Sequence, residues 1–182
     1  SLYDSRETNA IISFLMEEVC GISRTEMIMY PERTLDSSLA EKLSAYAKRL
    51  SEGEPVQYVL GYEYFMGQKF FVNKDVLIPR PETAELVRWI VEDYVENPVN
   101  KSAYMSENPV DNSLKIVDIG TGSGCIALSL ARLINNSKVF AFDLSTGALE
   151  TAQKNAEALN IKNITFLQID ILDNQDKTFE HP

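Results

Sequence analysis

The sequence predicts an α/β protein in which a doubly wound, mostly parallel sheet follows a small helical bundle and a β-hairpin. Strand and helix patterns alternate from Lys115 onward in the order β-α-β-α-β, which is typical of a parallel sheet with helical crossovers. The first 50 or so residues carry apolar positions at helical spacing. A short stretch of alternating apolar residues lies between these regions. Hydrophobic residues make up 45% of the 182 residues, enough for a packed core.

Composition excludes several classes of function. The chain has 17 Lys and Arg against 27 Asp and Glu, a net charge of −10, which argues against binding to a nucleic-acid backbone. No apolar run reaches the roughly 20 residues that a membrane span needs. One histidine, His181, and two cysteines, Cys20 and Cys125, are too few for a disulfide scaffold or a common metal site. We therefore expect a cytoplasmic protein without a bound metal.

The front of the chain, residues 1–53, is predicted to form three short helices. Ile11 and Leu15 lie on one apolar side of the first helix, which Gly21 is expected to end. Capping boxes, in which a Ser side chain and a Glu side chain satisfy free amides at a helix start, are predicted at Ser23 and Ser38.

Residues 54–79 are predicted to link the bundle to the α/β part, residues 80–182. Apolar alternation over 62–72 predicts a β-hairpin that turns at Gly67 and Gln68. A helix follows the prolines near residue 80, and its apolar side is expected to contain Leu86, Val87, Ile90, Val91 and Tyr94. Residues 96–113 are polar and are expected to form an irregular surface connection.

A glycine-rich turn carries the main functional signal. A strand over 115–119 is followed by Gly120, Thr121, Gly122, Ser123 and Gly124, and then by a helix over 126–133. Glycines let a ligand approach the backbone, and the helix start supplies free N–H groups. In an open parallel sheet, ligands bind beyond the carboxyl ends of the strands. This turn is therefore the predicted cofactor site.

Two acidic residues end the next strands at the same edge. Asp143 follows a strand over 139–142, where a carboxylate can accept hydrogen bonds from both hydroxyls of a ribose. Asp170 follows a strand over 164–169 and is placed to approach the rim of an adenine ring. Cys125 is interpreted as a small buried helix residue rather than a nucleophile.

Two cofactors fit this pattern. Gly122–Ala127 matches the G-x-G-x-x-A form of a dinucleotide site, which would suit a nicotinamide-dependent oxidoreductase. Asp118, just before the turn, favours S-adenosylmethionine, because its carboxylate would attract the ammonium of that ligand and repel a pyrophosphate.

Three motifs together resemble the HemK/PrmC-type protein-(glutamine-N5) methyltransferases. They are Gly53–Gly61 (GEPVQYVLG), Leu77–Thr83 (LIPRPET) and Val117–Ala131 (VDIGTGSGCIALSLA). The resemblance runs over nearly the whole chain and implies a helical substrate-recognition domain, a hairpin linker and a class I, Rossmann-like methyltransferase domain. It implies S-adenosylmethionine as cofactor and, as substrate, the glutamine of the GGQ motif in peptide chain release factors. No contact with nucleic acid or membrane is expected.

The resemblance also implies roles for particular residues. Gly120–Gly124 would line the methionine side of the cofactor, Asp143 would hold the ribose, and Asp170 with Ile171 would flank the adenine. A second segment would border the pocket: Arg80, Pro81, Glu82 and Thr83. Many family members have Glu where this chain has Ala84.

The resemblance places the substrate-binding Asn-Pro-Pro-Tyr motif after the last residue, Pro182. We therefore expect the sequence to be the N-terminal portion of a longer enzyme, inactive alone, with no catalytic residue of its own. A non-catalytic, cofactor-binding fragment is the remaining alternative.

Overall fold

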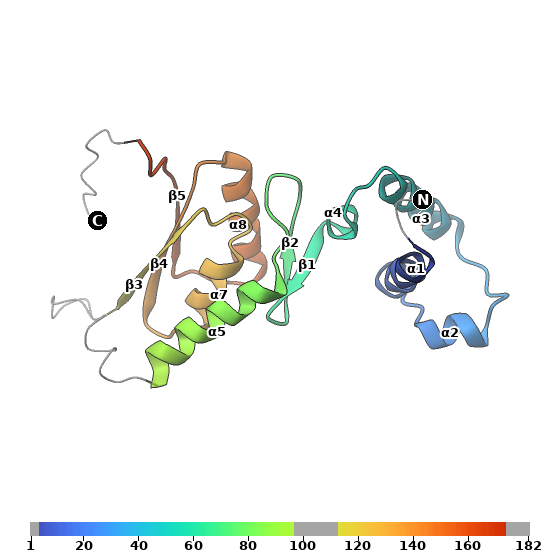
Figure 1. The fold of residues 1–182 in the computed structure, drawn as a ribbon, viewed down its shortest axis with the longest axis horizontal. Helices are drawn as coiled ribbons and strands as arrows, with labels where there is room; N and C mark the ends of the chain where they lie inside the picture. The colour runs from blue at the N-terminus through green and yellow to red at the C-terminus, as the bar shows by residue number, and fades with distance from the viewer. Residues whose placement is uncertain (1–3, 97–112, 174–182) are drawn as a thin grey trace. The chain divides into compact units, whose positions relative to one another are not determined.

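The computed structural model describes residues 4–96 and 113–173 (Figure 1). Most of the predicted polar connection and His181 lie outside the described residues. The chain divides into two compact units, Ser1–Leu60 and Gly61–Pro182, which we call the first and second units.

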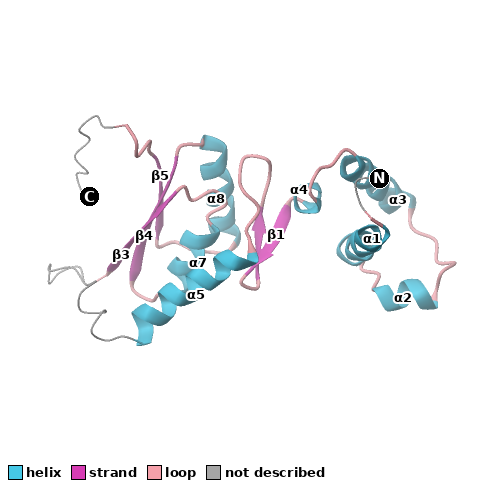
Figure 2. Ribbon diagram, in the orientation of Figure 1, coloured by secondary structure: helices cyan, strands magenta, loops and turns pink. Residues whose placement is uncertain are grey.

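The described part of the first unit is helical (Figure 2). Its elements are α1 (Ser5–Cys20), α2 (Arg24–Met29), α3 (Ser37–Ser51) and α4 (Val56–Leu60). Helix α1 begins with a capping box at Asp4 and ends at Gly21, whose φ of 65° is the left-handed conformation that glycine adopts without strain. The three predicted helices are confirmed, whereas α4 was not predicted.

One of the two predicted capping boxes is present. Ser23 and Glu26 bond each other's backbone N–H groups at the start of α2, as predicted. The prediction at Ser38 is wrong, because the cap of α3 lies two residues earlier. There the Asp36 carboxylate is the cap and accepts a hydrogen bond from the Ser38 N–H. A carboxylate and a serine compete as caps at this point, and both residue types are favoured.

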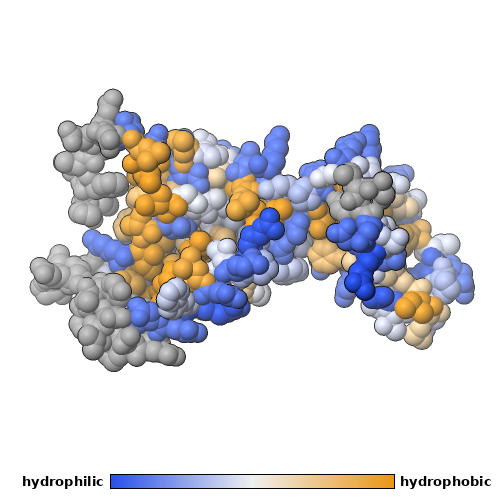
Figure 3. Space-filling model, viewed as in Figure 1, coloured by the Kyte–Doolittle hydropathy of each residue, from blue (hydrophilic) through white to orange (hydrophobic). Residues whose placement is uncertain are grey.

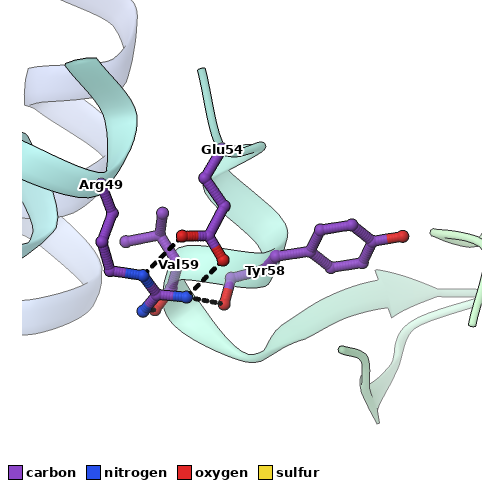
Figure 4. A network of polar contacts seen from close by, with 4 residues as sticks. All are labelled: Arg49, Glu54, Tyr58 and Val59. Carbon is purple, nitrogen blue, oxygen red and sulfur yellow. Dashed lines mark hydrogen bonds and ion pairs between the residues drawn. The ribbon is translucent and has the colours of Figure 1, made fainter. Parts of the chain in front are cut away.

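The first unit has a small apolar core supported by one polar network. Leu15, Leu50 and Val59 are buried together, so α4 packs on α1 and α3. Arg49 of α3 donates to both Glu54 carboxylate oxygens at 2.6 Å and to the carbonyls of Tyr58 and Val59 at 3.0 Å (Figure 4). One guanidinium thus joins α3, the following turn and α4.

The second unit opens with the β-hairpin, formed by β1 (Tyr62–Phe65) and β2 (Gln68–Phe71). Phe65 pairs with Gln68, so the turn is Met66–Gly67 and not Gly67–Gln68 as predicted. Both turn residues have positive φ, 49° and 73°. This conformation suits the right-handed twist of paired strands, and it explains why the turn includes the glycine as its second residue.

The remainder alternates helix and strand. The elements are α5 (Pro81–Glu96), β3 (Leu114–Ile119), α7 (Cys125–Leu133), β4 (Ser137–Asp143), α8 (Thr146–Ala158) and β5 (Ile164–Gln168). The three strands form a parallel sheet in the order β3-β4-β5. The predicted β-α-β-α-β order and parallel sheet are confirmed.

Helix α5 buries only part of the predicted apolar side: Val87, Val91 and Tyr94 pack in the core as predicted, whereas Leu86 and Ile90 do not. Ala84, Val87 and Tyr94 are buried in the main core, with Val91 against it. Leu86 and Ile90 were expected on that side, but they are 45% and 37% exposed. The helix therefore carries apolar residues over a wider arc than its contacts in the described structure cover.

The two faces of the sheet differ in burial. Ile116, Ile164 and Phe166 pack against the core formed with α5, α7 and α8. The alternate residues Val117 and Ile119 of β3 are 53% and 56% exposed. Figure 3 shows apolar side chains gathered over this part of the second unit. Parallel strands normally carry apolar residues on both faces, which explains the pattern of β3.

Candidate cofactor site

The glycine loop, Gly120–Gly124, follows the carboxyl end of β3, and its first residues are hydrogen-bonded to the neighbouring strand, β4. The backbone N–H groups of Gly120 and Thr121 both donate to the Phe142 carbonyl, at 2.8 and 2.9 Å. Phe142 is the residue before Asp143, the last residue of β4. The hydrogen bonds of the parallel pair thus continue into the loop, and they bring the loop beside Asp143.

The loop glycines have two different physical roles. Gly120 and Gly122 have φ of 73° and 54°, and a Cβ added to either would meet no atom within 4 Å. Their backbone is therefore open to an approaching ligand. Gly124 also has positive φ, but a Cβ there would lie 3.0 Å from Leu128 Cδ1 and 3.2 Å from Ala152 Cβ. Gly124 is thus required for close packing at the start of α7.

Asp118 lies beneath the loop. Its Oδ2 accepts a hydrogen bond of 2.8 Å from the Thr121 hydroxyl. Burial raises the pKa of the Asp118 carboxyl, and the nearby charge of Asp143 raises the pKa further, although the Thr121 hydroxyl opposes the shift. A positively charged group in the loop would relieve this cost, because it stabilises the ionised carboxylate.

Asp143 supports the loop as well as facing it. Its Oδ2 accepts from the Gly122 N–H and its Oδ1 accepts from the Ser145 N–H, each at 2.9 Å. An ionised carboxylate has about four acceptor positions, so two of these remain for other donors. The predicted binding of ribose hydroxyls is compatible with this geometry, and the bond to Gly122 was not foreseen.

Asp170 and Ile171 follow β5 at the same edge of the sheet. β5 ends at Gln168, one residue before the predicted end, and the Ile169 N–H donates to the Asp143 carbonyl at 3.2 Å. Asp170 and Ile171 are both exposed, and an Asp170 oxygen accepts from the Leu172 N–H at 2.9 Å. Their predicted position beyond the strand end is confirmed, and their contact with adenine stays a prediction.

The segment Arg80–Thr83 forms the beginning of α5. Arg80 and Glu82 are exposed, and Pro81 is the first helical residue, where the missing N–H costs nothing. Ala84 points into the main core with 6% exposure, so a Glu at this position would need a rearrangement to reach water. The part of residues 80–83 in cofactor binding stays a prediction.

Cys125 is the first residue of α7 and is buried, as predicted. Burial is the main cause that raises the pKa of its thiol. A thiol with a raised pKa forms little thiolate, so Cys125 is a structural residue.

Sequence reasoning missed one polar residue that touches the loop. The Asn155 side chain donates to the Ser123 carbonyl at 2.9 Å, and it is fully buried. Its position was visible as an anomaly, because Asn155 lies among Ala148, Ala152 and Ala156 on the apolar side of α8. A polar side chain at such a position needs partners in the core.

Residues 4–96 and 113–173 lack two kinds of feature. Within these ranges, no cluster of His, Cys, Asp and Glu has the arrangement of a metal site. In the same part of the chain, no helix has the length and hydropathy to cross a membrane.

The fold and the loop define a class I methyltransferase domain. The family model "Methyltransferase domain" matches residues 110–181. The model "PrmC N-terminal domain" matches residues 3–61. A parallel sheet with a glycine loop after its first strand and an acidic residue ending the second agrees with the first of these matches.

Several curated relatives share one name. The chain is 40% identical to the release factor glutamine methyltransferase of Flavobacterium psychrophilum, over 97% of the chain and 58% of that relative. It is 38% identical to the enzyme of that name in Bacillus subtilis, over 92% of the chain and 54% of the relative. It is 44% identical to the enzyme of that name in Lactococcus lactis, over 82% of the chain and 49% of the relative. The chain thus spans about half the length of these relatives.

Over the part that it covers, the chain is similar to these release factor glutamine methyltransferases, and its residues 3–61 match the PrmC N-terminal domain. A methyltransferase domain uses S-adenosylmethionine, and the described residues fit that group. The bare backbone at Gly120 and Gly122 leaves room for it, and two carboxylates, Asp118 and Asp143, lie where a cationic ligand would be attracted. The match to a methyltransferase domain favours this cofactor over the dinucleotide alternative.

Proposed function

We propose that the whole protein transfers a methyl group from S-adenosylmethionine to the side-chain amide nitrogen of the glutamine in the GGQ motif of peptide chain release factors. The observation that carries this proposal is the similarity of the chain to three relatives, each named release factor glutamine methyltransferase, over 82% to 97% of its residues.

Within the second unit, the described residues are assigned to cofactor binding. Asp118, Gly120, Thr121, Gly122, Ser123 and Gly124 would surround the methionine end, Asp143 would bind the ribose, and Asp170 with Ile171 would lie at the adenine. Arg80, Pro81, Glu82 and Thr83 would border the pocket.

Charge supports the assignment of the methionine end. S-adenosylmethionine carries an ammonium and a sulfonium, and the sulfonium makes its methyl group transferable. Asp118 is half-buried beneath the loop, so its attraction for a cation is less screened than that of a fully exposed carboxylate. A pyrophosphate at the same place would face the charges of both Asp118 and Asp143.

The amide substrate explains why orientation matters. An amide nitrogen is a poor nucleophile, because its lone pair is delocalised into the carbonyl. Acceptors for its N–H groups would orient the nitrogen towards the methyl carbon, and such positioning supplies much of the rate gain. The resemblance assigns these acceptors to an Asn-Pro-Pro-Tyr motif, and the described residues are assigned no role in the chemical step.

The first unit is assigned to substrate recognition. It is a compact unit with its own core, and it matches the PrmC N-terminal domain. Ile28, Met29 and Tyr30, at and just after the end of α2, are 72%, 60% and 55% exposed. Three adjacent exposed apolar residues form a surface on which a protein partner can dock.

Mass analysis tests the proposal. The full-length protein is incubated with S-adenosylmethionine and a purified release factor, and the release factor is then digested. We expect a gain of one methyl group on the peptide that contains GGQ, and none when that glutamine is replaced by alanine. A methyl group on another residue, or unmodified release factor with a cofactor-binding enzyme, would reject the substrate assignment.

A further inference from the structure

Asn155 of α8 uses its whole side-chain amide to join three segments of the second unit. Its Oδ1 accepts from the Phe71 N–H at 2.6 Å. Its Nδ2 donates to the Phe71 carbonyl at 3.0 Å and to the Ser123 carbonyl at 2.9 Å. The side chain is fully buried. One amide therefore connects α8, the end of β2 and the glycine loop.

This contact is one of three between α8 and the segment Phe71–Asp75. The Asn73 side chain donates to the Thr151 hydroxyl at 3.1 Å, and the Asp75 side chain lies against Gly147, where a Cβ would be only 2.9 Å from Asp75 Cγ. The α8 residues in these contacts are thus four residues apart: Gly147, Thr151 and Asn155. Their partners are two residues apart: Asp75, Asn73 and Phe71. Residues four apart lie on the same side of a helix, and the facing segment passes from β2 into a turn at Lys74 and Asp75.

Together, the three contacts hold the segment Phe71–Asp75 along α8. Phe71 gains a further contact, because the Lys154 Nζ lies 3.9 Å from the centre of its ring. The two contacts at Thr151 and Gly147 connect only the helix and this segment. Asn155 alone among the three also reaches the loop, through Ser123, which lies between the open Gly122 and the tightly packed Gly124.

We propose that Asn155 is a positioning residue for cofactor binding: by holding the Ser123 carbonyl, it keeps the backbone of the glycine loop in the conformation that receives S-adenosylmethionine. The inference rests on the proposed function, because it takes the loop as the cofactor site. A free loop would have to be ordered at the moment of binding, and that ordering reduces affinity. In the wild-type protein, Asn155 orders the loop on folding, so the loop does not have to be ordered when the cofactor binds.

The simpler interpretation is that Asn155 only stabilises the fold. Asn163 provides a control at a more exposed position. Its Nδ2 donates to the Ala131 and Ser137 carbonyls at 2.9 and 3.1 Å, at the opposite end of β4 from the loop. Loss of either amide removes bonds to two backbone carbonyls, but only Asn155 touches the loop.

The experiment compares full-length Asn155→Ser, Asn155→Asp and Asn163→Ala with the wild type. Asn155→Asp keeps the acceptor for the Phe71 N–H and loses the donors to the Phe71 and Ser123 carbonyls, so it is a second variant that removes the contact with the loop. Calorimetry gives the dissociation constant of S-adenosylmethionine, hydrogen exchange gives the protection of a peptide covering Gly120–Gly124, and thermal unfolding gives stability.

For both Asn155 variants, we expect the dissociation constant to rise roughly tenfold and exchange in the loop to accelerate, because a buried amide bond is lost next to the site. For Asn163→Ala, we expect lower stability with affinity and loop exchange within about twofold of the wild type. Equal effects of Asn155 and Asn163 variants on affinity and loop exchange would overturn the inference. If the wild type binds no S-adenosylmethionine, the proposed function fails, and the exchange data alone then decide the role of Asn155.

Discussion

The Asp143 carboxylate accepts a hydrogen bond from the Gly122 N–H, 2.9 Å from nitrogen to oxygen, across the gap between the end of β4 and the glycine loop. The same carboxylate accepts from the Ser145 N–H, at the cap of α8. Asp143 therefore holds in place the loop beside which it is expected to bind the ribose. A substitution at this residue removes a ligand contact and a support for the loop together.

Asp143→Ala is expected to weaken S-adenosylmethionine binding by about 1–3 kcal/mol, the scale for losing charge-assisted hydrogen bonds next to a ligand. Calorimetry of the full-length protein measures this change. Thermal unfolding serves as the control for folding, because the bonds to Gly122 and Ser145 are lost too. Unchanged affinity in a folded variant would contradict the role of Asp143.

Gly122→Ala and Gly124→Ala are expected to fail in different ways. At Gly122 the Cβ enters open space, so the variant should fold with a strain of roughly 1–2 kcal/mol from its positive φ and should lose cofactor affinity. At Gly124 the same strain is joined by contacts of 3.0 and 3.2 Å with Leu128 and Ala152, so this variant should be less stable than Gly122→Ala. Unfolding temperatures and binding constants of the two variants test the contrast. A Gly122→Ala protein that binds as the wild type does would show that the ligand lies elsewhere.

Cofactor affinity is expected to fall as the pH falls through the raised pKa of Asp118. Burial raises that pKa in the ligand-free protein, and a bound cation would lower it, so binding should release a proton in this pH range. Asp118→Asn should bind more weakly and lose this pH dependence. Titrations in buffers of different ionisation enthalpy measure the proton count, and an affinity independent of pH in the wild type would contradict the prediction.

The same pKa shift has a consequence for stability. When folding raises the pKa of a carboxyl, the folded state binds the proton more tightly than the unfolded state does, so protonation of that carboxyl stabilises the folded protein. The contribution of Asp118 is therefore present below the unfolded pKa and is lost as the pH rises through the folded pKa. Asp118→Asn should remove this loss, so the stability of the variant relative to the wild type should increase with pH over that range.

Arg49→Met is expected to lower the unfolding temperature of the first unit more than Glu54→Gln does. Arg49 donates to Glu54 and to two backbone carbonyls, whereas Glu54 contributes only to the ion pair. Arg33→Met is the matched control, because the Arg33–Glu26 pair is a single exposed contact of 3.7 Å, which contributes little. Equal effects of Arg49 and Arg33 substitutions would contradict the structural role of the network.

Acid should weaken the Arg49 network with a defined sign. The hydrogen bonds from Arg49 are the largest cause that lowers the pKa of Glu54. The contribution of Glu54 to stability is therefore present above its unfolded pKa and is lost as the pH falls through the lowered, folded pKa. The Glu54→Gln variant should show a smaller loss of stability over that acidic range.

Cys20 is expected to react with iodoacetamide before Cys125 does. Cys20 is half-buried, whereas Cys125 is buried and burial raises the pKa of its thiol. Mass analysis of the native protein after timed labelling measures the order. Faster labelling of Cys125 would show that the start of α7 opens or that this thiol has a lowered pKa.

Much of the fold was predictable because its signals are local. The helical periodicity before Gly21, the capping box at Ser23 and the alternation around Phe70 each depend on a few neighbouring residues. The errors arose where two local signals compete. Asp36 displaced Ser38 as the cap of α3, and the positive φ of both Met66 and Gly67 placed the hairpin turn one residue earlier.

The buried side of α5 could be predicted only in part from its own pattern. Val87 and Tyr94 are buried as predicted, but the exposure of Leu86 and Ile90 depends on what packs against each residue. Only the tertiary structure supplies that information, because the contacts that bury Tyr94 come from distant segments.

The candidate site was predictable as a set of residues but not as a set of contacts. The glycines and the acids at the strand ends follow from the topology of a parallel sheet. The bond between Asp143 and Gly122 and the bonds from Asn155 join residues far apart in sequence. No periodicity reports such pairs, although a polar residue on an apolar helix face marks where one is needed.

The most direct test of the cofactor site is a crystal structure of the full-length protein with S-adenosylhomocysteine, the product left by the methyl donor. We predict that the ribose hydroxyls lie within hydrogen-bond distance of the Asp143 carboxylate and that the amino-acid end lies against Gly120 and Gly122. Density for the ligand away from the ends of β3, β4 and β5 would contradict the account.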